Sequence, residues 1–140
     1  MKFHQVTAAF VLALGLALDS PAAPSRRDEI LGTWTGTSTC VDRARHPACK
    51  DEVVVYEFRE KPDAPDGVSL QADKIVDGQR VTMGELDFTW DPGEGAWLGE
   101  FRIRNNHGLW RFVVHGASME GTLVDLPEKN LVRKVAVKRP

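Results

Sequence analysis

The feature that most constrains the fold is the alternation of apolar and polar residues along nearly all of the chain after residue 29. A period of two places successive side chains on opposite faces of an extended strand, here one apolar face and one wet face. Clusters of Pro, Gly, Asn and Asp, which end strands and form turns, separate the alternating segments. The predicted strands are Ile30–Cys40, Glu52–Glu60, Val68–Ile75, Val81–Trp90, Trp97–Arg104, Gly108–Val114, Met119–Leu126 and Leu131–Lys138.

Eight strands with short connections predict an all-β protein, an eight-stranded antiparallel up-and-down barrel. The apolar residues of each strand share one parity and are expected to point inward, whereas their charged neighbours point outward. Eight strands leave an interior that side chains just fill or that holds one small ligand. No segment after residue 23 has helical apolar spacing over ten residues, so no helix is predicted there.

Side-chain chemistry suggests the register of two hairpins. Pairing Asp87 with Arg102 would place opposite charges together outside the barrel and paired aromatic residues inside. Pairing Phe112 with Gly121 would let the ring lie over a bare backbone. We therefore expect both hairpins to adopt these alignments.

Four glycines fall on the inward-facing parity of the predicted strands, namely Gly36, Gly84, Gly99 and Gly121. Glycine inside a strand often marks a bend or a place where another group approaches the backbone closely. These glycines are expected to allow barrel bends or to make room for aromatic rings. The alternative is that they widen a pocket.

The N-terminal segment has the pattern of a secretory signal peptide. A basic start at Lys2 precedes the apolar run Val6–Leu18, and small residues follow at 20–23. The apolar run is shorter than the roughly 20 residues of a membrane span. We predict a signal peptide over residues 1–22, a linker over 23–29 and a single barrel domain over 30–140, which places the protein in the periplasm or outside the cell.

The two cysteines, Cys40 and Cys49, flank a short polar stretch. In an exported protein an even pair at this spacing predicts a disulfide. The alternative is a metal site formed by both thiolates and His46, but a fourth ligand is missing, so no metal or other cofactor is expected.

The charge balance argues against polyanionic partners. The formal net charge is −2 at pH 7. A chain so close to neutrality has no electrostatic basis for binding nucleic acid or an anionic membrane surface. The protein is expected to be a monomer that does not insert into a membrane after removal of the signal peptide.

Barrel topology predicts which loops lie together, because connections alternate between the two ends. The Cys40–Cys49 loop should share one end with the turns near residues 76–79, 105–107 and 127–130. His46 and His107 are therefore expected at the same mouth, and His115 at the opposite end.

Gly32, Thr33 and Trp34 open the first strand, and Arg133 lies in the last. This arrangement resembles the lipocalin and calycin group, in which a first-strand Gly-x-Trp is covered by a basic side chain from the last strand. The resemblance implies a ligand-binding barrel in which Arg133 lies across the indole of Trp34 as a cation–π partner. It also implies that the ligand mouth is the end that carries the first hairpin loop.

Three functions follow as hypotheses. The first is a small apolar or amphipathic ligand in the lumen, contacted by Trp34, Tyr56, Phe88, Trp90, Phe101, Trp110, Phe112 and Arg133. The second is an extracytoplasmic protein partner, as for periplasmic inhibitors of proteases or lysozyme, bound through residues 24–29 and 41–48. The third is a filled barrel with a structural role. The chain lacks the nucleophile-elbow, zinc-protease and phosphate-loop motifs, so it is not expected to be an enzyme.

Overall fold

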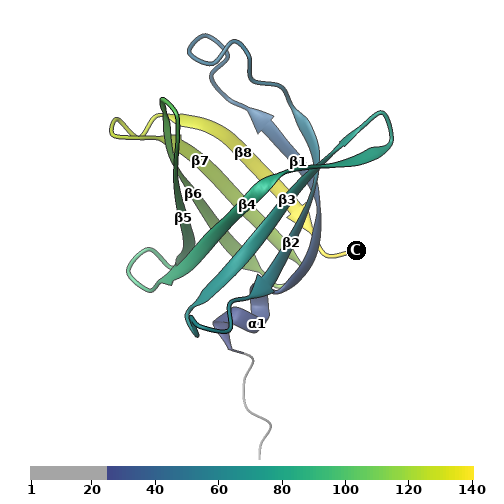
Figure 1. The fold of residues 1–140 in the computed structure, drawn as a ribbon, viewed down its shortest axis with the longest axis vertical. Helices are drawn as coiled ribbons and strands as arrows, with labels where there is room; N and C mark the ends of the chain where they lie inside the picture. The colour runs from purple at the N-terminus through teal and green to yellow at the C-terminus, as the bar shows by residue number, and fades with distance from the viewer. Residues whose placement is uncertain (1–24) are drawn as a thin grey trace, which may run out of the picture.

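The computed structural model describes residues 25–140, so the predicted signal peptide lies outside the described residues. Residues 32–138 form a closed antiparallel barrel in which each strand pairs with the next, and β1 and β8 complete the circle (Figure 1). The strands are β1 (Gly32–Cys40), β2 (Glu52–Glu60), β3 (Gly67–Val76), β4 (Gln79–Asp91), β5 (Ala96–Ile103), β6 (Asn106–His115), β7 (Ser118–Asp125) and β8 (Leu131–Lys138). The predicted fold class is confirmed.

The connections gather at two ends, as predicted from the alternating strand directions (Figure 1). One end carries the loop between β1 and β2, in which Cys40 and Cys49 form the predicted disulfide. We call this the disulfide end. The other carries the short helix α1 (Arg26–Ile30) and is called the helix end.

Helix α1 corrects the prediction of a linker over residues 23–29 and of a first strand that begins at Ile30. The Ser25 side chain accepts a hydrogen bond from the Asp28 backbone, and the Asp28 side chain accepts one from Ser25. This reciprocal cap stabilises a helix too short for its apolar period to be visible in the sequence. Ile30 is fully buried, so the helix anchors the chain at the barrel before β1 begins at Gly32.

No helix within residues 25–140 is long and apolar enough to cross a lipid bilayer.

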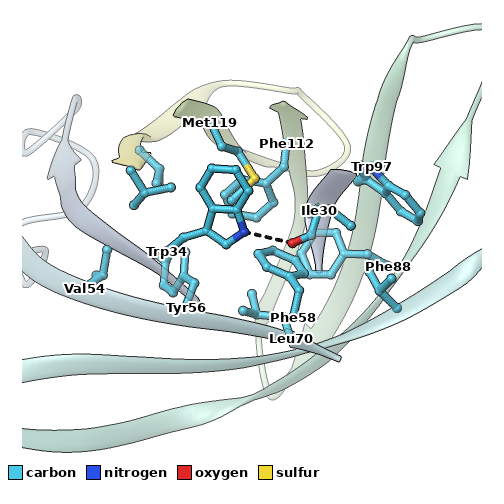
Figure 2. Close-up of a cluster of buried hydrophobic side chains, with 13 residues drawn as sticks. Ile30, Trp34, Val54, Tyr56, Phe58, Leu70, Phe88, Trp97, Phe112 and Met119 are labelled. Atoms are coloured by element: carbon cyan, nitrogen blue, oxygen red, sulfur yellow. Dashed lines mark hydrogen bonds between the residues drawn. The ribbon is translucent and has the colours of Figure 1, made fainter. Parts of the chain in front are cut away.

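Inward-facing apolar side chains fill the half of the barrel nearer the helix end (Figure 2). The buried apolar residues are Ile30, Trp34, Val54, Tyr56, Phe58, Val68, Leu70, Phe88, Ala96, Trp97, Phe112, Met119, Val135 and Val137. Most of them lie at the positions predicted to face inward. This agreement is expected, since a shift of one residue in strand register would move the apolar side chains of a strand from the core to the solvent.

Trp34 is completely buried near the helix end, where its indole N–H donates a 2.8 Å hydrogen bond to the Ile30 carbonyl (Figure 2). The cation above its ring is Arg139, whose guanidinium carbon lies 4.2 Å from the ring centroid. The prediction that Arg133 covers Trp34 is therefore wrong. Arg133 lies near the start of β8, opposite Cys40 and thus at the disulfide end, whereas Arg139 follows β8 and reaches the Trp34 end.

Two inward glycines make room for aromatic rings, as predicted. Phe112 is paired with Gly121 in the expected register, and a Cβ atom on Gly121 would lie 2.4 Å from the Phe112 ring. A Cβ atom on Gly99 would similarly lie 2.7 Å from the ring of Phe88. Phe88 and Phe112 pack against each other with ring centroids 5.4 Å apart, so these glycines permit the aromatic centre of the core.

The predicted register between β4 and β5 is wrong by two residues. Trp90 pairs with Trp97, which aligns Phe88 with Gly99. Asp87 contacts Lys61 instead of Arg102, and Arg102 bonds to His107. Seating the Phe88 ring over a bare backbone determines the register here, because an exposed ion pair contributes little by comparison.

A β-bulge interrupts the pairing of β3 with β4. Ala72 pairs with Gly84 and Asp73 pairs with Thr82, so Met83 is the extra residue. Asp73 has the outward parity of β3, yet its side chain is only 2% exposed because Arg80 forms an ion pair over it. Burial raises the pKa of Asp73, but hydrogen bonds from Arg80, Thr82 and Gln71 outweigh burial and hold this pKa below its ordinary value.

Replacing Asp73 with asparagine is expected to lower the free energy of unfolding by about 1–3 kcal/mol at neutral pH, because the charged acceptor for Arg80 is lost. Since the folded-state pKa is below the unfolded one, the carboxylate stabilises the fold above about pH 4, and this contribution disappears as the pH falls through the folded-state pKa. Urea denaturation of both proteins between about pH 6 and pH 2 should show the stability difference shrinking. A constant difference would contradict this assignment.

Candidate functional site

The half of the lumen nearer the disulfide end contains a cavity of about 280 Å³. It begins where the aromatic core ends, because Phe112 and Tyr56 belong to both the core and the cavity wall. The lining residues are Ser38, Glu52, Tyr56, Leu70, Ala72, Met83, Gly84, Glu85, Leu86, Phe101, Ile103, Trp110, Phe112 and Arg133. The barrel is therefore filled in one half and open in the other.

Five of the eight predicted lumen residues line this cavity, namely Tyr56, Phe101, Trp110, Phe112 and Arg133. The other three do not, because they lie nearer the helix end. Trp34 and Phe88 are buried in the aromatic core. Trp90 is half-buried against Trp97, and the guanidinium carbon of Arg26 lies 4.9 Å from the centroid of the Trp90 ring.

One wall of the cavity is polar, and the sequence-based prediction missed two of its four residues. Ser38 on β1, Glu52 and Tyr56 on β2, and Arg133 on β8 lie on three adjacent strands. We call these four residues the polar wall. The available signal was parity, since Ser38 and Glu52 share the inward-facing parity of Trp34 and Val54 respectively.

Arg133 organises the polar wall. Its guanidinium donates to the hydroxyl of Ser38 at 3.0 Å and to the backbone carbonyl of Lys50 at 2.7 Å. Glu52 lies between two cations, with its oxygens 3.6 Å from Arg133 and 3.7 Å from Lys74. The Arg133 and Glu52 side chains are only 14% and 18% exposed. Both charges are thus held at the cavity surface in a partly shielded environment, where electrostatic interactions are stronger than in bulk water.

Tyr56 supplies a neutral hydroxyl at the same wall. Burial raises the pKa of Tyr56 to about 12, although the neighbouring Ser38 side chain acts in the opposite direction. The phenol therefore stays protonated at any physiological pH and can both donate and accept a hydrogen bond.

The rest of the cavity surface is largely apolar. Leu70, Ala72 and Leu86 come from β3 and β4, and Phe101 and Trp110 from β5 and β6. The Trp110 ring is stacked on Phe112 with a centroid separation of 5.9 Å and an interplanar angle of 7°. Gly84 keeps this side open, since a Cβ atom there would have no neighbour within 4 Å among the described residues. The cavity can therefore accept a molecule with one polar group and an apolar body.

A second pocket of about 370 Å³ lies at the disulfide end and contains both His46 and His107, which confirms that they share one mouth. His46 Nε2 is 3.7 Å from an Asp125 carboxylate oxygen. The imidazole of His107 bonds to Glu100 and to Arg102. Within residues 25–140, no three His, Cys, Asp or Glu side chains are arranged to hold a metal ion. Residues at the ends of β5 to β8 and four residues of the connecting loops line this pocket, and we assign no ligand to it.

Comparison with known proteins identifies the fold. No protein-family model matches the chain, and no curated protein matches its sequence. Among solved structures, the redesigned β-barrel mFAP1 bound to DFHBI has a TM-score of 0.57 at 14% identity, covering 81% of this chain and 97% of its own. Fatty-acid-binding protein 1 of Echinococcus granulosus has a TM-score of 0.53 at 12% identity, covering 80% of this chain and 98% of its own.

At these identities the likeness shows the fold alone. It supports the closed antiparallel barrel predicted from the strand pattern, whereas membership of the calycin group stays a prediction. The lipocalin subtype stays a prediction, because the tryptophan of its motif is covered by Arg139 instead of Arg133.

Proposed function

We propose that the protein is an exported, non-enzymatic carrier that binds a small amphipathic molecule in the cavity at its disulfide end. The observation that carries the proposal is the two-sided cavity, which has the polar wall on β8, β1 and β2 and apolar side chains elsewhere. Ligand sites are typically concave and mostly apolar, with a few polar groups that fix orientation. The two barrels described above also support this proposal, since one is bound to DFHBI and the other is named a fatty-acid-binding protein.

The proposed ligand places its polar group against the polar wall and its apolar body against Phe101 and Trp110. Arg133 and Tyr56 offer hydrogen-bond donors, and Glu52 offers an acceptor. The wall carries charges of both signs, so a neutral hydroxyl-bearing head can be satisfied there as well as an ionic one.

Export is supported by the signal-peptide pattern of residues 1–22 together with the disulfide. Disulfides persist in oxidising compartments such as the periplasm and the extracellular space.

A second candidate is a protein-binding module that acts through the loop over residues 41–48. What supports it is the exposure of this loop, in which Val41 is 46% exposed, and its closure by the Cys40–Cys49 disulfide. The N-terminal arm is a weaker contributor to such a function than the sequence suggested, because Ile30 and the backbone of Glu29 are fixed to the barrel.

Two measurements test the carrier. Native mass spectrometry of the mature protein, purified from its host without detergent, should show an extra mass that is lost on denaturation. Titration with 1-anilinonaphthalene-8-sulfonate should then give saturable fluorescence from the ligand-free protein.

Filling part of the cavity should weaken this binding. Ala72→Phe adds a ring at a cavity-lining position and is expected to weaken dye affinity about tenfold or more, equivalent to at least about 1.4 kcal/mol. Val53→Phe is the matched control, because Val53 is 54% exposed on the outer parity of β2 and does not line the cavity. The carrier function would be overturned, and the loop function favoured, by two results together. The wild-type protein and both folded variants would bind the dye equally well, and native mass spectrometry would show the mass of the polypeptide alone.

A further inference from the structure

The barrel wall is open on one side, between β4 and β5. These strands pair through three residue pairs within residues 25–140, from Thr89 with Leu98 to Asp91 with Ala96, all near the helix end. Each of the other strand junctions has at least six pairs. Beyond Thr89 and Leu98 the two strands separate toward the disulfide end, and we call the space between them the slot.

The slot is continuous with the cavity. Residues 83–86 of β4 and residues Phe101 and Ile103 of β5 flank the slot, and the same residues line the cavity. Ile103 has the inward parity of Trp97 and Phe101, yet it is 62% exposed. An inward side chain is exposed here because β4 no longer pairs across from it.

Apolar side chains border the slot on both strands. Met83, the extra residue of the β-bulge, is 41% exposed and lines the cavity from β4. Val81, two residues earlier, is 43% exposed. Together with Ile103, these two residues form an apolar rim that leads from the cavity toward solvent. Single exposed apolar side chains are common on protein surfaces and need no explanation. Continuity with the cavity distinguishes this group from such scattered residues.

The slot lies across the barrel from the polar wall. In the order of the closed sheet, β4 and β5 are half a circuit away from β8 and β1, which carry Arg133 and Ser38. A molecule whose head contacts the polar wall therefore directs its other end toward the slot. The cavity volume of about 280 Å³ is at or just below the lower end of the range for small-molecule pockets, roughly 300–1,000 Å³.

We propose that the ligand is a single-chain amphiphile whose apolar tail is longer than the cavity and leaves the barrel through the slot, between Met83 and Ile103. This inference rests on the proposed carrier function, because it assigns the class of molecule that the same cavity takes. The head stays at the polar wall, the middle of the chain fills the cavity, and the distal part lies on the apolar rim.

The test is a chain-length series of straight-chain primary alkanols, from hexanol to dodecanol, that compete with 1-anilinonaphthalene-8-sulfonate. Alkanols are neutral, so the result does not depend on the sign of a head-group charge. Affinity for the wild-type protein is expected to rise along the whole series by about two- to fourfold per methylene, the upper value being that of full burial. A closed cavity would instead give a plateau at the length that fills it.

Variants at the rim locate the tail. Met83→Asp and Ile103→Asp are each expected to weaken dodecanol binding at least about tenfold more than hexanol binding, because only the longer chain reaches the slot. Val53→Asp changes an apolar residue whose exposed fraction lies between those of Met83 and Ile103 but which does not line the cavity, so this variant should leave the whole series unchanged.

The outcomes separate the two proposals. Failure of the dye and of every alkanol to bind the folded protein would overturn the carrier function itself. Saturable binding with a plateau at short chains, or an equal loss for all chain lengths in the rim variants, would overturn the slot assignment alone. An affinity that grows with chain length and falls selectively in Met83→Asp and Ile103→Asp supports both.

Discussion

Replacing Trp34 with alanine is expected to lower the free energy of unfolding by about 3–5 kcal/mol, the range for removal of a buried aromatic side chain. Trp34 is completely buried and bonds through its indole N–H to the Ile30 carbonyl. The Arg139 guanidinium lies over its ring and donates a 2.7 Å hydrogen bond to the carbonyl of Leu31. The substitution therefore removes core packing, the indole hydrogen bond to Ile30 and the cation–π contact with Arg139.

Denaturation by guanidinium chloride, followed by circular dichroism, measures this loss. Trp90→Ala is the matched control, because Trp90 is only half-buried and its substitution should cost less than about 2 kcal/mol. Similar losses for the two tryptophans would contradict the placement of Trp34 as a fully buried core residue near the helix end.

Replacing Gly36 with alanine is expected to destabilise the barrel by about 3 kcal/mol or to prevent folding. A Cβ atom on Gly36 would lie 2.1 Å from the Ala136 carbonyl oxygen and 2.8 Å from the Val137 Cα. Both are backbone atoms of β8, so relief would require the closing junction between β1 and β8 to move. Overpacking against a side chain typically costs 1–3 kcal/mol, and a backbone is less able to yield.

Gly84→Ala provides the comparison at another inward glycine. Among residues 25–140, a Cβ atom on Gly84 meets nothing within 4 Å, so this variant should change stability by less than about 1 kcal/mol. Thermal unfolding of the three proteins checks both expectations. A Gly36→Ala protein as stable as Gly84→Ala would mean that β1 and β8 do not approach as closely as described.

Much of the architecture could be predicted because two-residue periodicity and turn chemistry are local signals. The Phe112–Gly121 register followed from a ring that needs a bare backbone. The β4–β5 register failed because the pairing of Asp87 with Arg102 was given more weight than the seat that Gly99 offers to Phe88. Buried packing outweighs exposed charge, so the same ring-over-glycine rule would have selected the correct alignment.

The site was harder to predict because parity says which way a residue points but not how far along the barrel it lies. Trp34 and Phe88 were correctly predicted to face inward, yet they lie in the filled half. The predicted contact between Arg133 and Trp34 came instead from the family resemblance, and the structure contradicts it. Antiparallel order already separates them, since β1 starts at the helix end and β8 starts at the disulfide end. Glu52 was overlooked because inward positions were searched for apolar residues.

Barrel closure by β1 and β8 has a consequence for the order of folding. The strand at one end of the described chain pairs with the strand at the other, and Arg139 then bonds to the backbone of Glu29 and Leu31. These contacts join residues about as distant in sequence as the domain allows, so the entropy of closing a long loop must be overcome before they form. The hairpins from β2 to β7 can assemble earlier from local contacts. Docking of α1 and packing of Arg139 over Trp34 are therefore expected to be late events, possible only once β8 has been synthesised.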